Sequence, residues 1–320
     1  MTSKERVIAQ LEFRDTDRFP FNFNMARRVI GDYERDLGPD FRVRHYGVDL
    51  IETFPLLRFP GGRVEEVDGI AWVREPYLTD WAHADDIVMP DPRDEGVYAH
   101  IKANLEKFPD SAILVNIPGP FTVLHGIRIY DNLYLDIYDA PDAYHRLARR
   151  IFDVYDEVIR QAVKFPVAAV YFQDDVASSS GLNMSLAHIK EFVFSYMLNG
   201  IATAKKAGKK VLYHSDGNTA GILDTLCEMG FDAVNPMQPE YNDFAAFKKR
   251  FHGRMGVYGA LDNGTIIPYG TPDQIRAHIS YVAQTLGAGN GLIFSTSDLI
   301  DPAMPRENID LMVECIKRAK

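Results

Sequence analysis

The stretch Val167-Ala-Ala-Val-Tyr-Phe-Gln173 decides the fold class of this chain. Its unbroken apolar character is typical of a strand that is buried on both faces of a parallel sheet. A helical pattern near residues 186–207 follows, and Gly208 suits the position just past the end of that helix. The stretch Lys210-Val-Leu-Tyr213, apolar after its first residue, then predicts the next strand. Strand, helix and strand together indicate a parallel βαβ unit.

The same alternation extends outward from this unit. Toward the C-terminus we expect strands at Ala233–Asn235, Met255–Tyr258 and Leu292–Phe294, and helices near residues 219–229, 243–251, from 271 onward and over 306–317. Toward the N-terminus we expect strands at Phe19–Phe23 and Ile113–Ile117, a long helix over 141–164, and a hairpin or lid inserted within 46–81. A doubly wound open sheet would explain one half of the chain only. The count of strands favours an α/β fold of the (β/α)8 TIM-barrel class with extra N-terminal elements.

Length, charge and cysteine content narrow the functional classes. The chain has 320 residues, above the roughly 250 that are typical of such a barrel, and without a linker or repeat we expect residues 1–320 to form one domain. A formal net charge of −10 argues against nucleic acid and anionic membranes, which attract clustered Lys and Arg. Two cysteines, a charged N-terminus and the lack of an apolar run of about 18 residues predict a cytoplasmic protein without a membrane span.

Polar residues gather directly after the expected strands, where barrel enzymes place their reacting groups. Asp174 and Asp175 follow the first of these strands, and His214-Ser-Asp-Gly-Asn218 follows the second. Later strands are followed by Gln238, Glu240, Asp262, Asn263 and Ser295–Asp298. We therefore expect an active site at the C-terminal mouth of the barrel. Its catalytic candidates are His214, Asp174 and Asp175, and its candidate substrate contacts are Tyr258, Asp262 and Gln238.

Each candidate also has a structural alternative. Asp174 and Asp175 could cap the following helix, and two adjacent acids at a strand end are costly unless cations, donors or a proton compensate. Asp262 lies in Leu-Asp-Asn-Gly, which is ordinary turn chemistry. His214 could form a structural hydrogen bond, although its position before Ser-Asp-Gly-Asn at a strand end favours a functional role.

A metal site is one interpretation of the same residues. His214 and Asp216 are two positions apart on an extended turn, so both side chains could face one centre, and Asp298 on the closing loop could be a third ligand. A histidine nitrogen with carboxylate oxygens suits a divalent ion, either zinc or a harder metal. The metal-free alternative is a His–Asp pair in which the carboxylate orients the imidazole for proton transfer. The sequence leaves both open.

Motifs along nearly the whole chain resemble the uroporphyrinogen decarboxylase superfamily, which also contains cobamide-dependent methyltransferases. Their order and spacing carry the resemblance, and they are Ser3-Lys-Glu-Arg-Val, Asp17-Arg-Phe-Pro, Gly47-Val-Asp, Pro118-Gly-Pro-Phe, Gln173-Asp-Asp, His214-Ser-Asp-Gly-Asn, Gly259-Ala-Leu-Asp and Ile300-Asp-Pro-Ala-Met-Pro-Arg-Glu-Asn308. The resemblance implies a (β/α)8 barrel, in agreement with the strand pattern.

Departures from the decarboxylase pattern imply another reaction. The Arg-Gln-Ala-Gly-Arg pattern is missing from residues 21–28, the aspartate of a Phe-Ser-Asp motif has no match in Ile51-Glu-Thr-Phe-Pro55, and Asp298 stands where the decarboxylase has a histidine. A tetrapyrrole with eight carboxylates is therefore an unsuitable substrate. The His-Xaa-Cys motif and later Cys that bind zinc in the methyltransferases correspond to His214, Asp216 and Asp298.

The resemblance thus implies a methyltransferase-like enzyme that moves a methyl group between a small methylated or methoxylated substrate and a separate corrinoid protein. A decarboxylase of a small carboxylated substrate is the alternative from another reaction class. A non-catalytic binding protein on an enzyme scaffold is a third hypothesis. The expected partners are a small molecule and the corrinoid protein, and a homodimer is one candidate assembly.

Overall fold

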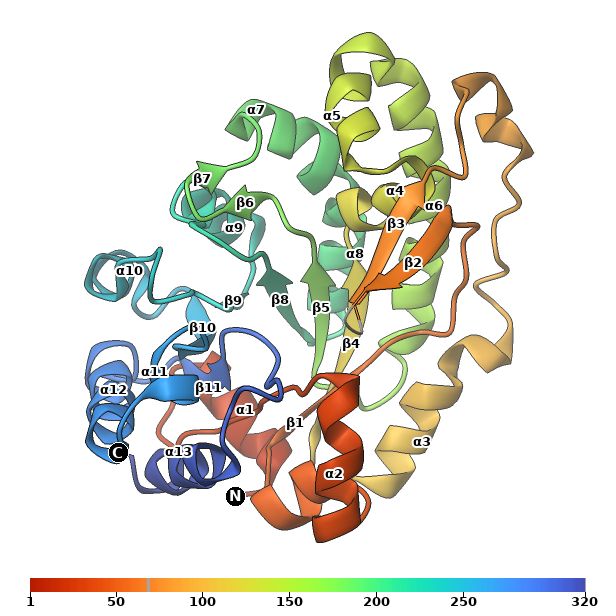
Figure 1. Cartoon of the computed structure of the whole chain (residues 1–320). Coiled ribbons are helices and arrows are strands. Elements are labelled where there is room, and N and C mark those ends of the chain that lie inside the picture. The colour runs from red at the N-terminus through yellow and green to blue at the C-terminus, as the bar shows by residue number, and fades with distance from the viewer. Residues whose placement is uncertain (68–69, 320) are drawn as a thin grey trace.

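Seven parallel strands curl around one axis in the computed structural model, which describes residues 1–67 and 70–319 (Figure 1). In spatial order they are β1 (Leu50–Thr53), β4 (Ala112–Pro118), β5 (Ala169–Gln173), β8 (Lys210–His214), β9 (Ala233–Asn235), β10 (Gly256–Leu261) and β11 (Leu292–Thr296). Chain order and spatial order agree, as in a sheet built from successive βα units. The strands expected in the second half of the sequence are confirmed: Ala233–Asn235 matches at both ends, and the ends of the others differ by at most three residues.

The segment around Phe21 closes the gap between β11 and β1. The Phe294 amide donates to the Pro20 carbonyl, and the Asn22 amide donates to the Phe294 carbonyl, both at 2.9 Å. On the other side the Asp49 amide donates to the Phe21 carbonyl, also at 2.9 Å. This segment therefore takes the place of an eighth strand, as expected for Phe19–Phe23. The fold is the predicted (β/α)8 barrel.

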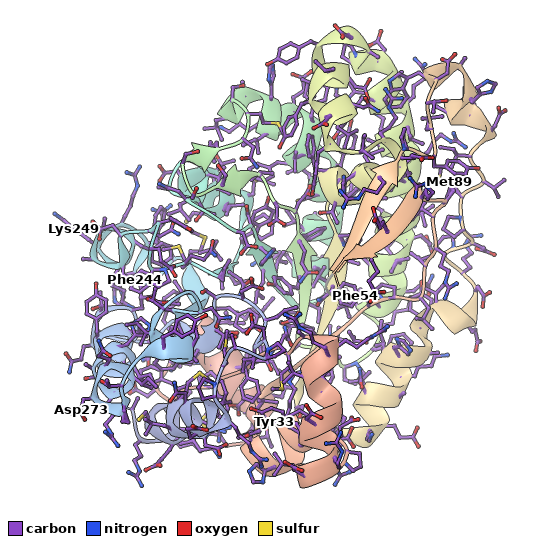
Figure 2. All side chains as sticks on the ribbon, in the orientation of Figure 1. Tyr33, Phe54, Met89, Phe244, Lys249 and Asp273 are labelled. Atoms are coloured by element: carbon purple, nitrogen blue, oxygen red, sulfur yellow. The ribbon has the colours of Figure 1, made fainter. Side chains whose placement is uncertain are left out.

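Helices surround the sheet, and their buried faces carry the apolar residues. They are α2 (Arg27–Leu37), α3 (Ala99–Lys107), α4 (Pro120–Arg128), α5 (Tyr130–Asp139), α6 (Pro141–Ala162), α7 (Leu186–Ile189), α8 (Ser195–Lys206), α9 (Leu223–Met229), α10 (Phe244–Phe251), α11 (Ile266–Tyr269), α12 (Pro272–Thr285) and α13 (Arg306–Arg318). On α10, for example, Phe244 is buried and Lys249 is exposed (Figure 2). This division is the expected one for a helix packed on one side of a sheet.

The barrel interior is filled from its N-terminal end. Helix α1 (Ser3–Leu11) places Val7 and Leu11 in one buried cluster with Leu50, Leu114 and Leu212 of the strands. Side chains of this cluster are at most a few per cent exposed, and α1 contacts β1, β4 and β11. The lower part of the barrel is therefore a packed core, so a ligand can enter only from the mouth at the other end.

The region 46–81 is only partly the insertion that the sequence predicts. Strands β2 (Arg63–Val67) and β3 (Ile70–Glu75) do form an antiparallel hairpin, whose residues 68–69 lie outside the described part. However, Leu50–Thr53 is barrel strand β1, paired in parallel with β4. The prediction of a lid across the whole region was therefore wrong for these residues. β1 was missed because it has only four residues and carries the polar Glu52 and Thr53.

None of the described helices is long and apolar enough to cross a membrane.

Candidate functional site

A cavity of about 230 Å³ opens at the C-terminal mouth, between the ends of β1, β5, β8, β9, β10 and β11. The register of the sheet explains why these ends meet. Gln173 pairs with His214, and His214 pairs with Asn235, so the last residues of β5, β8 and β9 lie level with one another. A larger hollow of about 730 Å³ lies beside residues 15–19 and 283–290, away from the strand ends that carry the candidate catalytic groups. The mouth cavity is the candidate active site.

His214 is fixed from two sides at the bottom of this mouth. Its Nδ1 lies 2.6 Å from Asn235 Oδ1, which also accepts the Tyr171 hydroxyl at 2.6 Å. The amide of Asn235 is oriented by its own donation to the Tyr258 carbonyl. Because an amide oxygen only accepts hydrogen bonds, Nδ1 of His214 carries a hydrogen. The other ring nitrogen, Nε2, is therefore the one that is available for chemistry.

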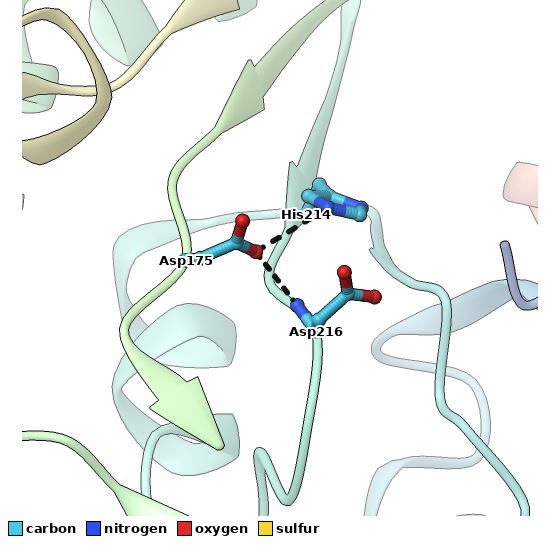
Figure 3. Close-up of side chains that lie close together, drawn as sticks. All are labelled: Asp175, His214 and Asp216. Carbon is cyan, nitrogen blue, oxygen red and sulfur yellow. Dashed lines mark hydrogen bonds and ion pairs between the residues drawn. The ribbon is translucent and has the colours of Figure 1, made fainter. Parts of the chain in front are cut away.

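Asp175 and Asp216 complete a compact group with His214, as Figure 3 shows. His214 Nε2 lies 3.4 Å from Asp175 Oδ1, and the same oxygen accepts the Asp216 backbone amide at 2.9 Å. The Asp216 side chain points toward the space beside the imidazole (Figure 3). Its Oδ1 is buried and has no hydrogen-bond partner among the described residues. An unpaired buried carboxylate oxygen is costly, which points to a ligand at this position.

The electrostatics of the group favour a proton on the imidazole. Burial disfavours the charged form of His214, but the hydrogen bond and charge of Asp175, with help from Asp216 and Asn235, outweigh burial and raise its pKa to about 9. Burial also acts against the charge of Asp175, yet His214 lowers the pKa of that carboxyl. Burial raises the pKa of Asp216 to about 6, and the nearby charges of Asp175 and Asp298 act in the same direction.

The residues present fit a divalent ion. One nitrogen or oxygen from each of Asp175, His214 and Asp216 lies within 4.8 Å of the others. This set is one imidazole and two carboxylates, which suits zinc or a harder metal better than a soft one. The group differs from the predicted set, because Asp175 belongs to it. Asp298 lines the same cavity outside this compact group, so its role as a ligand stays a prediction.

The wall opposite His214 is built around Glu52, which the sequence analysis missed. Its Oε1 accepts the Tyr258 hydroxyl at 2.7 Å and the Asn24 amide at 3.0 Å, and its Oε2 accepts the Asn116 amide at 3.0 Å. The Tyr258 hydroxyl accepts the Asn22 amide at 2.7 Å. Tyr258 therefore lines the cavity, as predicted for a substrate contact, and is held in place by two partners. Assignment of 50–53 as a barrel strand would have revealed Glu52.

Asp174 has a structural position instead of a place in the cavity. Its two carboxylate oxygens accept the Phe121 amide at 2.9 Å, and the Thr122 amide and hydroxyl at 2.7 and 2.8 Å. These donors form the first turn of α4, so Asp174 caps the helix that follows β4, not the one that follows its own strand. A Cβ on Gly119 would lie 2.3 Å from the Asp174 side chain, so only glycine fits there.

Two predicted substrate contacts also lie outside the cavity lining. Asp262 accepts the amides of Thr265 and Ile266 and the Thr265 hydroxyl, which is the turn alternative raised by the sequence. Gln238 accepts the Gly217 amide and so supports the loop that follows β8. Asp262 is thus occupied by its own turn, and Gln238 by the backbone of the neighbouring loop. Asp262 and Gln238 would therefore affect a substrate by positioning the loops that they support.

Comparison with known sequences relates the chain to one family. The family model of uroporphyrinogen decarboxylase (URO-D) matches residues 60–319. The uroporphyrinogen decarboxylase of Legionella pneumophila (strain Lens) is 26% identical over 184 residues, which cover 56% of this chain and 49% of that protein. The one from Chloroherpeton thalassium is 25% identical over 252 residues, which cover 74% of this chain and 68% of that protein. The chain thus spans about half the length of the Legionella relative.

Solved structures agree on the fold. A methyltransferase from Methanosarcina mazei superimposes with a TM-score of 0.75 at 18% identity, and the match covers 99% of both chains. An endo-β-1,4-xylanase from Gloeophyllum trabeum gives a TM-score of 0.52 at 11% identity, covering 94% of this chain and 96% of the other. At such low identity the two structures show the barrel alone. The family model matches most of the chain, and the chain therefore belongs to the uroporphyrinogen decarboxylase family.

Proposed function

We propose that this protein is a methyltransferase-like enzyme that moves a methyl group between a small methylated or methoxylated compound and a corrinoid protein. One observation carries the proposal. His214, Asp175 and Asp216 meet at a cavity of about 230 Å³, below the roughly 300–1,000 Å³ of sites for drug-sized ligands. Two of the three residues, His214 and Asp216, correspond to positions that the sequence resemblance gives to the methyltransferase ligands. The small cavity suits a small methyl donor.

His214 would serve the leaving group. With a pKa of about 9 it keeps a proton at neutral pH, and Nε2 is the nitrogen that faces Asp175 and the neighbouring Asp216. A leaving group that departs as an alkoxide would take this proton, and one that departs as an amine would not need it. Asp175 stabilises the charged ring and fixes its orientation. Asn235 holds the opposite nitrogen.

A divalent metal is the second way in which these residues could act. Asp175, His214 and Asp216 would hold it, and the unpaired Oδ1 of Asp216 is the observation that favours it. When bound, such an ion would polarise the leaving group as a Lewis acid. Its binding would displace the proton from Nε2 of His214, so metal affinity should fall as the pH decreases. The corrinoid would come from the partner protein.

The alternative of a decarboxylase for a small carboxylated substrate has weaker support. Enzymes that bind carboxylates commonly use arginine or lysine. The described residues that line the cavity include Glu52, Asp216 and Asp298 but no arginine or lysine. The partly buried Arg42 lies behind this wall, where its Nη2 is already bonded to Asn22 and Asn24, so the described lining itself offers an anionic substrate no arginine or lysine partner. The family name alone favours decarboxylation here.

Formation of methylcobalamin from cob(I)alamin tests the proposal. Purified protein is incubated with cob(I)alamin and a panel of methoxylated and methylated amine donors, and the absorbance change is followed. We expect transfer from at least one donor. In His214→Ala, transfer from a methoxylated donor should be lost, whereas an amine donor does not need the His214 proton. Parallel reactions with chelator and with added zinc or manganese separate the metal from the proton mechanism. Failure with every donor, together with release of carbon dioxide from a small acid, would establish the decarboxylase instead.

A further inference from the structure

Two polar atoms in the mouth cavity are left without a partner, and they lie on different strand ends. Thr296, at the end of β11, is 5% exposed and lines the cavity, yet its Oγ1 is buried and unpaired among the described residues. Asp216, beyond the end of β8, also lines the cavity, and its Oδ1 is likewise buried without a partner among the described residues. Buried polar atoms in native proteins nearly always have a partner. The missing partner is therefore a group that a ligand brings.

The lining determines the charge of that group. Three carboxylates, Glu52, Asp216 and Asp298, line the cavity, and His214 is already paired with Asp175. Glu52 is held by donors of the protein itself, and the charge of the partly buried Arg42 offsets part of its own. Asp216 and Asp298 therefore supply the excess negative charge. An acceptor-rich wall with excess negative charge selects a cation that carries hydrogen-bond donors. An anion would be repelled, and a neutral ether would leave the acceptors unpaired.

Two tyrosine rings give the lining an apolar part. Tyr171 and Tyr258 both line the cavity, packed edge to face with ring centroids 6.0 Å apart at an angle of 62°. Their hydroxyls are already bonded to Asn235 and Glu52, so they offer a ligand ring carbon, which suits methyl groups. The volume of about 230 Å³ admits an ion of a few heavy atoms.

We propose that the donor of this enzyme is a small methylated ammonium ion that retains at least one N–H, bound through Asp216 Oδ1 and Thr296 Oγ1. The inference rests on the proposed methyl transfer and names its substrate class. In the step, the C–N bond breaks and its electron pair remains on nitrogen, so the amine leaves neutral. The electron pair of cob(I)alamin forms the new bond to the methyl carbon. No other proton, oxidant or reductant is required.

Binding titrations by calorimetry test this inference without any corrinoid. The probe is trimethylammonium, and the comparison ligands are tetramethylammonium, which has no N–H, neutral tert-butanol, and the anion pivalate. We expect trimethylammonium to bind chelator-treated protein about tenfold or more tightly than each of these, as one hydrogen bond to a charged group predicts. Equal or weaker binding than tert-butanol or tetramethylammonium overturns the inference. Binding of zinc without any binding of trimethylammonium overturns it as well, and assigns the unpaired atoms to a metal.

Matched variants locate the binding site. Asp216→Asn and Thr296→Val keep the shape of the side chain. Asp216→Asn should weaken trimethylammonium binding about tenfold, because it removes the charged acceptor of the single N–H, and Thr296→Val should weaken binding of dimethylammonium, which has a second N–H, about tenfold. Thr219→Val is the control, because Thr219 is also buried but its hydroxyl already contacts Asn242 outside the cavity. Wild-type affinity in both Asp216→Asn and Thr296→Val contradicts the inference. Methyl transfer from methoxy donors without cation binding would reject this inference alone, whereas cation binding without any methyl transfer would reject the proposed function alone.

Discussion

The chemistry of His214 is set by two hydrogen-bond acceptors on opposite sides of its ring. Asn235 Oδ1 lies 2.6 Å from Nδ1, and Asp175 Oδ1 lies 3.4 Å from Nε2. The first contact selects which nitrogen always carries a hydrogen, and the second stabilises a proton on the other. The pKa of His214, raised to about 9, is thus a consequence of the Asp175 charge overcoming burial.

Removal of the Asp175 charge should lower the pKa of His214. In Asp175→Asn, burial still disfavours the imidazolium but its main counter-charge is gone, so we expect the midpoint to fall by about 1–3 pH units. NMR of the imidazole ring measures this directly. Asp298→Asn is the control, because Asp298 lines the same mouth but acts on the pKa of Asp216. A His214 midpoint that is equal in wild type and Asp175→Asn would refute the assignment.

The same shift affects stability. The folded-state pKa of His214 lies above its ordinary value of 6.5, so the folded protein holds this proton more tightly than the unfolded chain. The stabilisation is complete below about pH 6.5 and is lost as the pH rises through about 9. In Asp175→Asn the loss of stability over this range should therefore be smaller.

The sequence predicts the charged residues of the site better than the neutral residues around them. His214, Asp175 and Asp216 follow strongly apolar strands, so their place at the mouth could be inferred from the strand pattern. Asn235 lies within an expected strand and Thr296 within the polar stretch 295–298, and the sequence singles out neither. The contact of Asn235 with His214 and the burial of the Thr296 hydroxyl appear only in the folded barrel. Asp174 and Asp175 are identical in type and adjacent in sequence. Only the direction of each side chain distinguishes the helix cap from the site residue.

At the scale of elements, the junction of β4, α4 and β5 depends on one buried carboxylate. Asp174 at the end of β5 caps α4, whose chain begins directly after β4. Burial raises the pKa of Asp174 to about 7, although the amides of Phe121 and Thr122 and the Thr122 hydroxyl oppose the rise. The cap therefore links two neighbouring βα units beside the active site.

Asp174→Ala should destabilise the fold, because it leaves the amides of Phe121, which is buried, and Thr122 without their carboxylate acceptor. We expect the free energy of unfolding to fall by about 2 kcal/mol, from the loss of the cap and the unpaired amides together. Denaturant unfolding followed by circular dichroism measures it. Asp32→Ala is the control, since the Asp32 side chain is 72% exposed and pairs with Arg35 at the surface. An equal loss of stability in the two variants would show that the Asp174 cap of α4 does not stabilise the fold.

Element prediction succeeds where a strand or helix has a strong local pattern. Strands β5, β8 and β11 are buried along nearly their whole length, as their apolar runs predict. The helix expected near residues 186–207 is present, although it consists of α7, a π-helical turn (Lys190–Phe194) and α8. Strand β1 carries the polar Glu52 because this residue lines the cavity. The polar residue interrupts the apolar pattern by which a strand is recognised in a sequence.

At the scale of the whole molecule, a set of buried ion pairs completes the barrel. Asp49 accepts hydrogen bonds from Arg6 at 2.6 Å and from Arg18 at 2.7 Å, and its Oδ2 accepts the Phe21 amide at 3.0 Å. These contacts tie α1 and the Phe21 segment to the start of β1. The motifs Asp17-Arg-Phe-Pro and Gly47-Val-Asp therefore support closure of the barrel. They lie at its lower end, away from the mouth.

The charge and size of the mouth lead to the last prediction, that the protein does not decarboxylate uroporphyrinogen at a physiological rate. This tetrapyrrole carries eight carboxylates, whereas the described lining of the cavity includes three carboxylates and no arginine or lysine. The net charge of −10 adds long-range repulsion. The cavity of about 230 Å³ is also smaller than sites for drug-sized ligands, which reach roughly 300–1,000 Å³.

Incubation of the purified protein with uroporphyrinogen, followed by chromatography for coproporphyrinogen, tests this prediction. We expect no product above the level of a heat-inactivated sample. The triple variant Glu52→Gln, Asp216→Asn, Asp298→Asn serves as a control for the physical reason: if charge alone excludes the substrate, the variant should bind the porphyrinogen, and if size also excludes it, the variant should not. Turnover by the wild type near the median enzyme value of about 10 per second would contradict the prediction. Such a result would mean that the mouth opens far wider than the cavity of about 230 Å³. It would also mean that the chain catalyses the decarboxylation after which its family is named.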